Sequence, residues 1–458
     1  MIWLATALAG APEAAFPIQT ITLDNGLEVW LQPRDGQAFA ALVVVRGGGR
    51  YESLESSGAS HLLEHMLFTG TERFPDERAL RNFVEERGGS FNGHTYDESV
   101  RYRVFLPARY QRDALEWLEQ VVYHPLLSQE QLDKEREVVF EERGGRDGWW
   151  MRKLHEAGFS QSIWLEAQRL YWPDSMLGVR RIGDDLSLDA MTLERIEAFH
   201  AQHYGPENSA LVLVGAFEPE VVLVDVEQVF GGLADGQRAP VAVPPPATPS
   251  SLPERQCLWD LGIWDQATLG LTCPAVGSED PLYPAADLAA WYLQDLLFDE
   301  LRTERALVYG VSADIQGWSD AGYLLVSADM DRRKLREAEA VLLDVMQEHR
   351  GGALDQVRLE RARQQAMGLT EIGFEESIDR AHMLGATWLA APSARRMTST
   401  ARWSASAEQV RQVFASWQSC TTWRQMALLS QRQAWALVAA LGLGLLGLAV
   451  WRVRRLGR

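Results

Sequence analysis

Five consecutive residues, His61-Leu62-Leu63-Glu64-His65, constrain the fold of this chain more than any other segment. On a helix, positions i, i+3 and i+4 share one face, so two imidazoles and one carboxylate point at the same place. Neutral imidazole nitrogen is a good metal ligand, and a catalytic metal site usually takes three protein ligands and leaves one position for water. The alternative is an exposed helix face with two solvated histidines. A metal site would require the fold to bring a third ligand to this helix from another segment.

A candidate for that third ligand lies about seventy residues further on. Residues 132–142 predict a helix, since their apolar side chains fall in one stripe. Glu135 and Glu142 are two turns apart and share a face, whereas Glu141 points about 100° away from Glu142. Such a face can present one carboxylate to a metal ion and a second to the outer shell, where it orients a histidine. The alternative is a solvated acidic helix face.

The two segments together resemble the pitrilysin/insulinase family of zinc metallopeptidases, in the two-domain form of the mitochondrial processing peptidase subunits. The family pattern is HxxEH followed by a ligand glutamate in ERxxVxxE, and Gly58–Thr71 and 135–142 match its two parts. The resemblance implies a zinc-dependent endopeptidase with one zinc ion per chain. The site residues that it implies are the ligands His61, His65 and Glu142, the general base Glu64 and the supporting carboxylate Glu135.

The resemblance also implies a strand that binds the substrate. Residues Gly88–Tyr96 resemble the family's GGxxNAxT strand, whose edge pairs with the substrate backbone. Asn92, Gly93 and Thr95 are the implied binding residues. Gly93 replaces the usual alanine, which an edge can tolerate because glycine permits close approach. His94 is either a further polar group of the cleft or a solvated side chain.

The order of the expected elements recurs after a proline-rich stretch. Residues 239–253 cannot form a helix or a central strand and are expected to link two folded bodies. On each side of this linker, helices flank a pair of adjacent strands, which indicates an internal duplication. Residues 291–297 (WYLQDLL) stand where HLLEH would be, so only the first half carries the metal ligands.

The expected elements share the order helix, strand, strand, helix. In the first half they span 61–67, 76–87, 90–95, 99–106 and 110–122, and in the second 285–304, 308–315, 322–328 and 334–350. The predicted class is α+β, with two related domains that each pack helices on an antiparallel-rich sheet. The predicted bounds are 17–236 for the catalytic domain, 237–253 for the linker and 254–425 for the non-catalytic domain.

The second half nevertheless holds a candidate substrate site. Residues Leu301–Tyr309 resemble the family segment LRxxxxLxY, although Ala306 replaces the usual glycine. The resemblance implies that Arg302 and Tyr309 contact the substrate near the scissile carbonyl, where the tyrosine can stabilise a growing oxyanion. In two-domain members this pair faces the zinc half of another subunit. Because one chain carries both halves, we expect a homodimer with composite active sites.

The net charge and the remaining histidines exclude further kinds of partner and metal site. The net charge is −19, which argues against nucleic acid and either favours cationic peptides or simply aids solubility. His200 and His203 form a second i, i+3 pair, but no carboxylate lies at ligand spacing, so no second metal site is expected. A catalytically silent member acting as a membrane-bound binding or assembly subunit is the alternative function.

The two ends of the chain predict its location. Residues 434–451 contain no charge and are long enough to span a bilayer as a helix, with a basic tail at 452–458. The positive-inside rule places that tail in the cytoplasm and the body on the exported side. Residues 1–16 resemble a signal peptide. The alternative is a tail-anchored enzyme that faces the cytoplasm.

The three cysteines leave two arrangements open. Cys257 and Cys273 flank an expected hairpin and could pair in an oxidising compartment, with Cys420 left alone. The other arrangement is three buried thiols.

Overall fold

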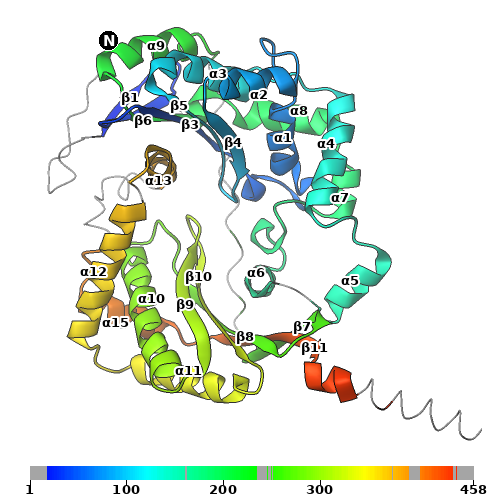
Figure 1. Ribbon diagram of the computed structural model, residues 1–458, viewed down its shortest axis with the longest axis vertical. Helices are drawn as coiled ribbons and strands as arrows, with labels where there is room; N and C mark the ends of the chain where they lie inside the picture. Colours follow the sequence, from blue (N-terminus) through cyan, green and yellow to red (C-terminus); the bar gives the residue numbers. More distant parts are fainter. Residues whose placement is uncertain are drawn as a thin grey trace, which may run out of the picture.

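The protein is built from two β-sheets, each packed with helices (Figure 1). The computed structural model describes residues 18–159, 162–234, 251–373, 375–390 and 403–436, together with positions 245, 249 and 440. The first half of the sequence forms the upper body in Figure 1 and the second half the lower body. The predicted α+β class is confirmed.

The first sheet has six strands in the order β1-β2-β6-β3-β5-β4. Its strands are β1 (Gln19–Thr22), β2 (Glu28–Pro33), β3 (Ala38–Arg46), β4 (Ser90–Thr95), β5 (Ser99–Pro107) and β6 (Ser209–Gly215). Only β2 and β6 run parallel, and the other pairs are antiparallel. Strand β4 lies at the edge and pairs only with β5.

Helices cover one face of the first sheet and form the larger core with it. The α-helices of this half are α1 (Ala59–Leu67), α2 (Glu77–Glu85), α3 (Gln111–Tyr123), α4 (Gln129–Glu142), α5 (Trp149–Glu156), α6 (Ile163–Tyr171), α7 (Asp185–Asp189), α8 (Leu193–His203) and α9 (Pro219–Phe230). Short 3-10 turns are η2 (Gly49–Tyr51), η3 (Leu54–Ser56), η4 (Ala108–Tyr110), η5 (Met176–Gly178) and η6 (Pro206–Asn208).

The second sheet repeats the strand order of the first. Its strands are β7 (Arg255–Ile263), β8 (Gln266–Ala275), β9 (Val308–Gly317), β10 (Gly322–Asp331) and β11 (Thr421–Leu429). The order β7-β11-β8-β10-β9 matches β2-β6-β3-β5-β4, and in each sheet the first two of these strands are the parallel pair. This correspondence has the strand order that an internal duplication predicts.

The helices of the second half form their own core on one face of this sheet. They are α10 (Tyr283–Leu297), the π-helical turn η7 (Phe298–Thr303), α11 (Leu335–His349), α12 (Gln356–Gly373) and α15 (Ala407–Ser416), while α13 (Ser377–Leu389) lies outside this core. Helix α10 and η7 together cover all but the last residue of the single helix that the sequence predicts at 285–304.

Each half lends a helix to the other, which the sequence pattern does not reveal. Helix α13 packs its apolar side on the second face of the first sheet, against strands β3 and β6. Helix α6, from the first half, packs on the corresponding face of the second sheet. Both helices lie between the two sheets (Figure 1), so the halves are joined by two reciprocal apolar contacts.

A polar contact also joins the halves, between the β9–β10 turn and the β4–β5 turn. The indole N–H of Trp318 donates to Asp97 Oδ2 at 2.8 Å. The buried guanidinium of Arg50 lies 2.5 Å from Glu98 Oε1 and 2.9 Å from Asp320 Oδ1. Because this charge is paired on both sides, the contact fixes the turn that follows β4.

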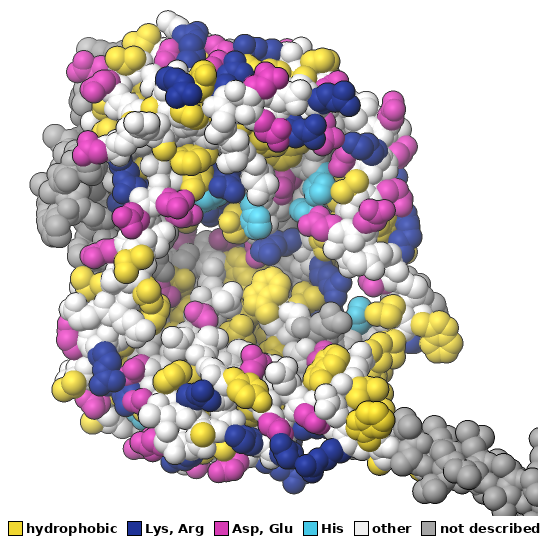
Figure 2. Space-filling view, viewed as in Figure 1, with side chains coloured by type: hydrophobic (Ala, Val, Ile, Leu, Met, Phe, Trp, Pro, Cys, Tyr) yellow, Lys and Arg dark blue, Asp and Glu magenta, His cyan; other side chains and the backbone are white. Residues whose placement is uncertain are grey.

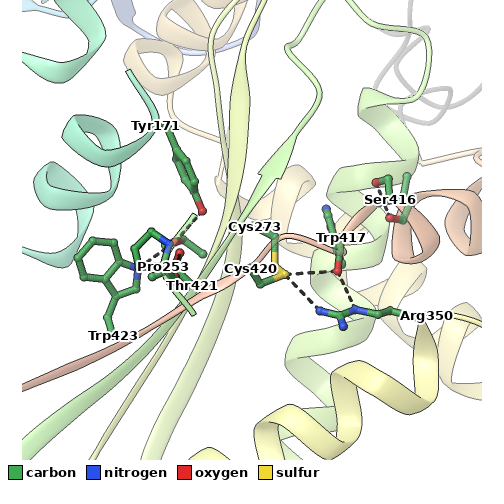
Figure 3. The surroundings of a disulfide bond; sticks show 11 residues. Tyr171, Pro253, Cys273, Arg350, Ser416, Trp417, Cys420, Thr421 and Trp423 are labelled. Carbon is green, nitrogen blue, oxygen red and sulfur yellow. Dashed lines mark hydrogen bonds between the residues drawn. A yellow bond between two sulfur atoms is a disulfide. The ribbon is translucent and has the colours of Figure 1, made fainter. Parts of the chain in front are cut away.

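The cysteine prediction is wrong. Cys273 forms a disulfide with Cys420 (Figure 3). Cys257 is free and exposed. Strands β7 and β8 do not pair as a hairpin, because β11 lies between them. Thr421 of β11 pairs with Thr272 of β8, so the cysteines next to them come together across that register.

Most of the predicted terminal and linker segments lie outside the described residues. The signal peptide at 1–16 does so entirely, and the membrane segment at 434–451 does so apart from four positions. Most of 239–253 is likewise outside. Of the helices that the structure does describe, none combines the length and apolar character needed to cross a bilayer.

Candidate active site

Helix α1 carries the HLLEH residues and begins at Gly58, whose φ of 93° is in the left-handed region. The backbone N–H groups of Gly58 and Ser60 donate to the carboxylate of Glu52 at 2.8 and 2.7 Å, so an acid satisfies the start of the helix. The apolar face of α1 is buried in the first core through Leu62, Leu63, Met66 and Leu67. That packing turns the opposite face of α1 toward α4.

Three ligand-type side chains converge between α1 and α4. Glu142 Oε2 lies 3.6 Å from His61 Nε2 and 3.4 Å from His65 Nε2. The donor atoms of these three residues all lie within 4.8 Å of one another. Within the described ranges, no other group of three or more His, Cys, Asp or Glu side chains brings its ligand atoms this close together.

The donor set fits a zinc ion. Tetrahedral coordination with ligand bonds of about 2.0–2.1 Å separates neighbouring ligand atoms by roughly 3.3–3.4 Å. The two nitrogen–oxygen distances to Glu142, 3.6 and 3.4 Å, are close to this spacing. Two imidazoles and one carboxylate are also a recurrent catalytic zinc set.

The carboxylate of Glu135 supports the second histidine. Glu135 Oε2 lies 3.5 Å from His65 Nδ1, the ring nitrogen that faces away from Glu142, and Lys134 Nζ lies 3.1 Å from Glu135 Oε1. A carboxylate on the far nitrogen fixes the ring orientation of a metal-binding histidine. The structure thus places Glu135 where the sequence expects an outer-shell acid.

The two histidines differ electrostatically. Burial and the neighbouring His65 ring lower the pKa of His61 to about 3, so that imidazole is neutral. Burial alone would lower the pKa of His65, but the carboxylates of Glu135, Glu64 and Glu142 raise it above its ordinary value. The three carboxylates therefore favour positive charge at His65, and a cation bound there would take the place of a proton on that ring.

Glu64 lines the same cleft as the three converging side chains and is held by β4. Thr95 Oγ1 donates to Glu64 Oε2 at 2.5 Å, and burial raises the pKa of Glu64. Gly93 makes room for the carboxylate, since a Cβ at that position would lie 2.7 Å from Glu64 Oε1. Glycine at 93 is therefore required by this arrangement of Glu64 as well as tolerated at the strand edge.

These groups open into a cleft of about 800 Å³ along β4. It is lined by His61, Glu64, His65, Phe68, Thr69, Glu77, Asn92, Gly93, His94, Thr95, Lys134, Glu135, Val138, Glu141 and Glu142. The three expected substrate residues of β4 therefore share the cleft with His61, His65 and Glu142. His94 is exposed and also lines it, which favours the first of its two interpretations.

Arg302 and Tyr309 lie elsewhere in the same chain. Neither lines the cleft, and Tyr309 instead lines a separate cavity of about 440 Å³ on the second half. Arg302 is exposed and donates to the carbonyl oxygen of Val308 at 3.0 Å. Tyr309 is the second residue of β9, about 26 Å of strand from Gly317, next to the turn that contacts the first half.

Other features of the site region have structural explanations. His200 Nε2 lies 2.9 Å from the Val122 carbonyl oxygen and His203 Nδ1 lies 3.2 Å from that of Arg46, so these two rings serve packing. Sequence reasoning missed Glu52, whose role depends on a loop that returns to α1. No spacing pattern could have identified it.

Comparisons with known proteins agree with this geometry. A family model described as "Insulinase (Peptidase family M16)" matches residues 30–164, and one described as "Peptidase M16 inactive domain" matches 190–366. An uncharacterized zinc protease of Mycobacterium bovis is 26% identical over 381 residues, which cover 82% of this chain and 84% of that protein. A probable mitochondrial-processing peptidase subunit beta of Arabidopsis thaliana is 28% identical over 232 residues, covering 50% of this chain but only 40% of the relative.

The fold is shared with solved structures. A putative M16-like peptidase from Alicyclobacillus acidocaldarius superposes with a TM-score of 0.77 at 18% identity, covering 92% of this chain and 99% of the other. The match to the insulinase family model covers β2 to the start of α6. The match to the inactive-domain family model ends within α12. The chain therefore belongs to peptidase family M16.

Proposed function

We propose that this protein is a zinc-dependent endopeptidase that hydrolyses peptides or unfolded segments. The observation that carries the proposal is the convergence of His61, His65 and Glu142, with donor atoms within 4.8 Å, beside the buried acid Glu64. The relatives named as zinc proteases support the same chemistry.

The residues of the cleft have separable roles in this proposal. A bound zinc ion supplies a Lewis acid that acidifies water and polarises the scissile carbonyl. Glu64 accepts the proton of the attacking water and delivers it to the leaving amine, and its raised pKa suits both transfers. Thr95 holds that carboxylate, while Glu135 holds the ring of His65.

The substrate binds as an added strand beside β4. This strand is paired on one side only, so its outer edge offers unpaired backbone groups to an extended peptide. Asn92, Gly93 and Thr95 lie along that strand and line the cleft. Folded proteins do not present such an extended segment, which favours peptides and unfolded chains.

The separation of Arg302 and Tyr309 from the cleft supports a homodimer with composite sites. In this proposal, the second half of one copy brings its Arg302 and Tyr309 to the zinc cleft of the other. An active monomer in analytical ultracentrifugation would refute it. Mixing Glu64→Gln protein with Arg302→Ala protein should restore activity, because one site of each hybrid dimer is intact.

We also propose that residues 434–451 anchor the protein in a membrane, with the catalytic body on the exported side. The support is the uncharged segment and the arginines after it. A membrane-impermeant protease applied to spheroplasts should digest the body. Protection of the body would instead support an anchor that faces the cytoplasm.

The direct test of the enzymatic proposal is digestion of a peptide library by the wild-type protein and by the Glu64→Gln variant, with zinc content measured in parallel. We expect cleavage by the wild type alone and one zinc ion per chain in both. Zinc retention without cleavage of any unstructured peptide would contradict the proposal and support a binding or assembly subunit.

A further inference from the structure

Two arginines of β5 lie next to the proposed substrate strand but on the face away from the helices. Side chains alternate along a strand, and Tyr102 and Val104 of β5 are buried in the first core. Phe105 packs on the opposite side, in the cluster that includes α13. Arg101 and Arg103 share the face of Phe105, so they look toward the space between the two halves.

The register of the sheet extends this basic face to β4. Arg103 pairs with Asn92 and Arg101 pairs with His94, so the four side chains occupy one face of two adjacent strands. Helix α13 packs on β3 and β6, and its His382 carbonyl oxygen accepts from Arg101 at 3.2 Å. We name Arg101, Arg103, Asn92 and His94 the basic strip. Figure 2 shows histidine and basic side chains together on the upper wall of the hollow between the halves.

No described ion pair neutralises the two arginines of the basic strip. Among the described residues, no carboxylate forms an ion pair with Arg101 or Arg103 within 4.0 Å. Arg101 contacts Ser99 Oγ at 3.3 Å, and its guanidinium lies 4.3 Å from the ring centroid of Tyr96. By contrast, the buried Arg50 nearby is paired with two acids. A partly buried cation without a counter-charge favours an incoming anion.

The strip lies within reach of a peptide added to β4. Neighbouring strands are about 4.8 Å apart, and every second side chain of an added strand points to the same face as Asn92 and His94. The guanidinium of Arg101 already crosses from β5 to the Tyr96 ring, which lies 4.3 Å from the ring of His94. A carboxylate on the added strand therefore meets amide, imidazole and guanidinium donors on this face.

We infer that the basic strip selects peptide substrates that carry an aspartate or glutamate side chain on the strip-facing side of the added strand. The inference rests on the proposed strand addition beside β4. It runs against the net charge of −19, which alone would favour cationic peptides. The local charge governs because a screened surface charge acts weakly beyond about 8–10 Å.

The test uses extended peptides that differ at one position, scanned along the four residues on each side of the cleaved bond. That position is glutamate, glutamine or lysine. We expect the zinc-loaded protein to prefer glutamate over glutamine by about tenfold in kcat/KM at alternate positions, as charge-assisted hydrogen bonds allow. Arg101→Gln and Arg103→Gln should each reduce the preference, and Arg103→Glu should shift it toward lysine.

Two controls make the outcome decisive. Arg109→Gln alters an exposed arginine after the far end of β5 and should keep the glutamate preference. Binding of the same peptides to Glu64→Gln protein, measured by fluorescence anisotropy, should show the same order without any cleavage. Equal rates for the three peptides, or a preference that survives both glutamine substitutions, would overturn the inference. If no peptide is cleaved, the proposed hydrolysis fails, and the anisotropy order alone decides the inference.

Discussion

Matching helix pairs in the two halves satisfy their charges in different ways. In the first half, His61 and His65 of α1 meet Glu142 of α4 at 3.4–3.6 Å. In the second, Arg358 of α12 lies 2.6 Å from Asp295 of α10 and 2.9 Å from Asp299 of η7. In the second half, an arginine of the chain itself neutralises the two aspartates. In the first half, two histidines and one glutamate face one another without an arginine or lysine between them. Matching positions of the two halves thus hold an internal ion pair in one half and a set of metal-ligand side chains in the other.

The largest effect expected from this difference is on metal binding. His65→Asn should reduce the zinc content from one ion per chain to near zero and lower peptide hydrolysis to background, because two remaining ligands cannot retain the ion. The matched second-half variant Arg358→Met should keep its zinc. Metal content is measured by inductively coupled plasma mass spectrometry after dialysis. Full zinc content in His65→Asn protein would break the comparison.

The free energy of unfolding should depend on the ion pair of the second half. Arg358→Met removes the cation that lies between Asp295 and Asp299 and leaves Asp295 only the longer, 3.5 Å contact with Arg361, so we expect a loss of about 1–3 kcal/mol in the free energy of unfolding. Urea titration followed by circular dichroism measures it. Arg81→Met, which removes an exposed pair with Glu85, is the control and should change little. Equal stability of the two variants would mean that the ion pair contributes nothing.

The contact between Thr95 and Glu64 should matter for turnover and not for metal. Thr95→Val removes the hydroxyl that donates to Glu64, so we expect kcat to fall about tenfold with zinc content unchanged. Thr95→Ser keeps the hydroxyl and should retain most of the activity. A Thr95→Val protein with wild-type kcat would show that Glu64 needs no such support.

Helix α13, which packs on the first sheet, should make the stability of the protein sensitive to acid. Burial, followed by the charges of Arg101 and Arg103, lowers the pKa of His382 on α13 from 6.5 to about 4. The unfolded chain therefore binds this proton first, so the contribution of His382 to stability is constant above pH 6.5 and falls as the pH drops toward 4. After allowance for solvent screening we expect about 1–2 kcal/mol. Urea titrations at pH 7 and pH 4.5 should show a smaller loss for His382→Asn than for the wild type, and an equal loss would contradict the assignment.

The smallest effect concerns the turn before β9. Ala306 has a φ of 49°, the left-handed region that glycine adopts without strain. Ala306→Gly relieves about 1 kcal/mol of strain but adds a similar entropy to the unfolded chain, so the free energy of unfolding should change by less than about 1 kcal/mol. Thermal unfolding measures it. A larger loss would show that the alanine methyl group has packing contacts that the backbone angle does not reveal.

Local patterns predicted much of the fold and of the site. The bounds of β4 agree with the sequence prediction, and the helical spacing of His61, Glu64 and His65 is that of α1. These features depend on residues within a few turns of one another. The proximity of Glu142 depended on a family resemblance, since a helix of acids can equally be solvated.

Long-range arrangements could not be read from the sequence. The pairing of Cys273 with Cys420 depends on β11, which comes from far along the chain and separates β7 from β8. Helix α13 packs on the first sheet and α6 on the second. The apolar side of a helix shows that it is buried but not which sheet it packs against, so this arrangement could not be predicted. The separation of Tyr309 from the cleft could not be predicted either, because similarity to a family motif does not say how far apart two segments of one chain lie.

The most direct test of the difference between the halves is an anomalous difference map at the zinc absorption edge, from crystals grown with zinc. We expect one peak per chain, bonded at about 2.0–2.2 Å to His61 Nε2, His65 Nε2 and a Glu142 oxygen, and none between α10 and α12. A map without that peak, or with an equal peak in the second half, would contradict the account.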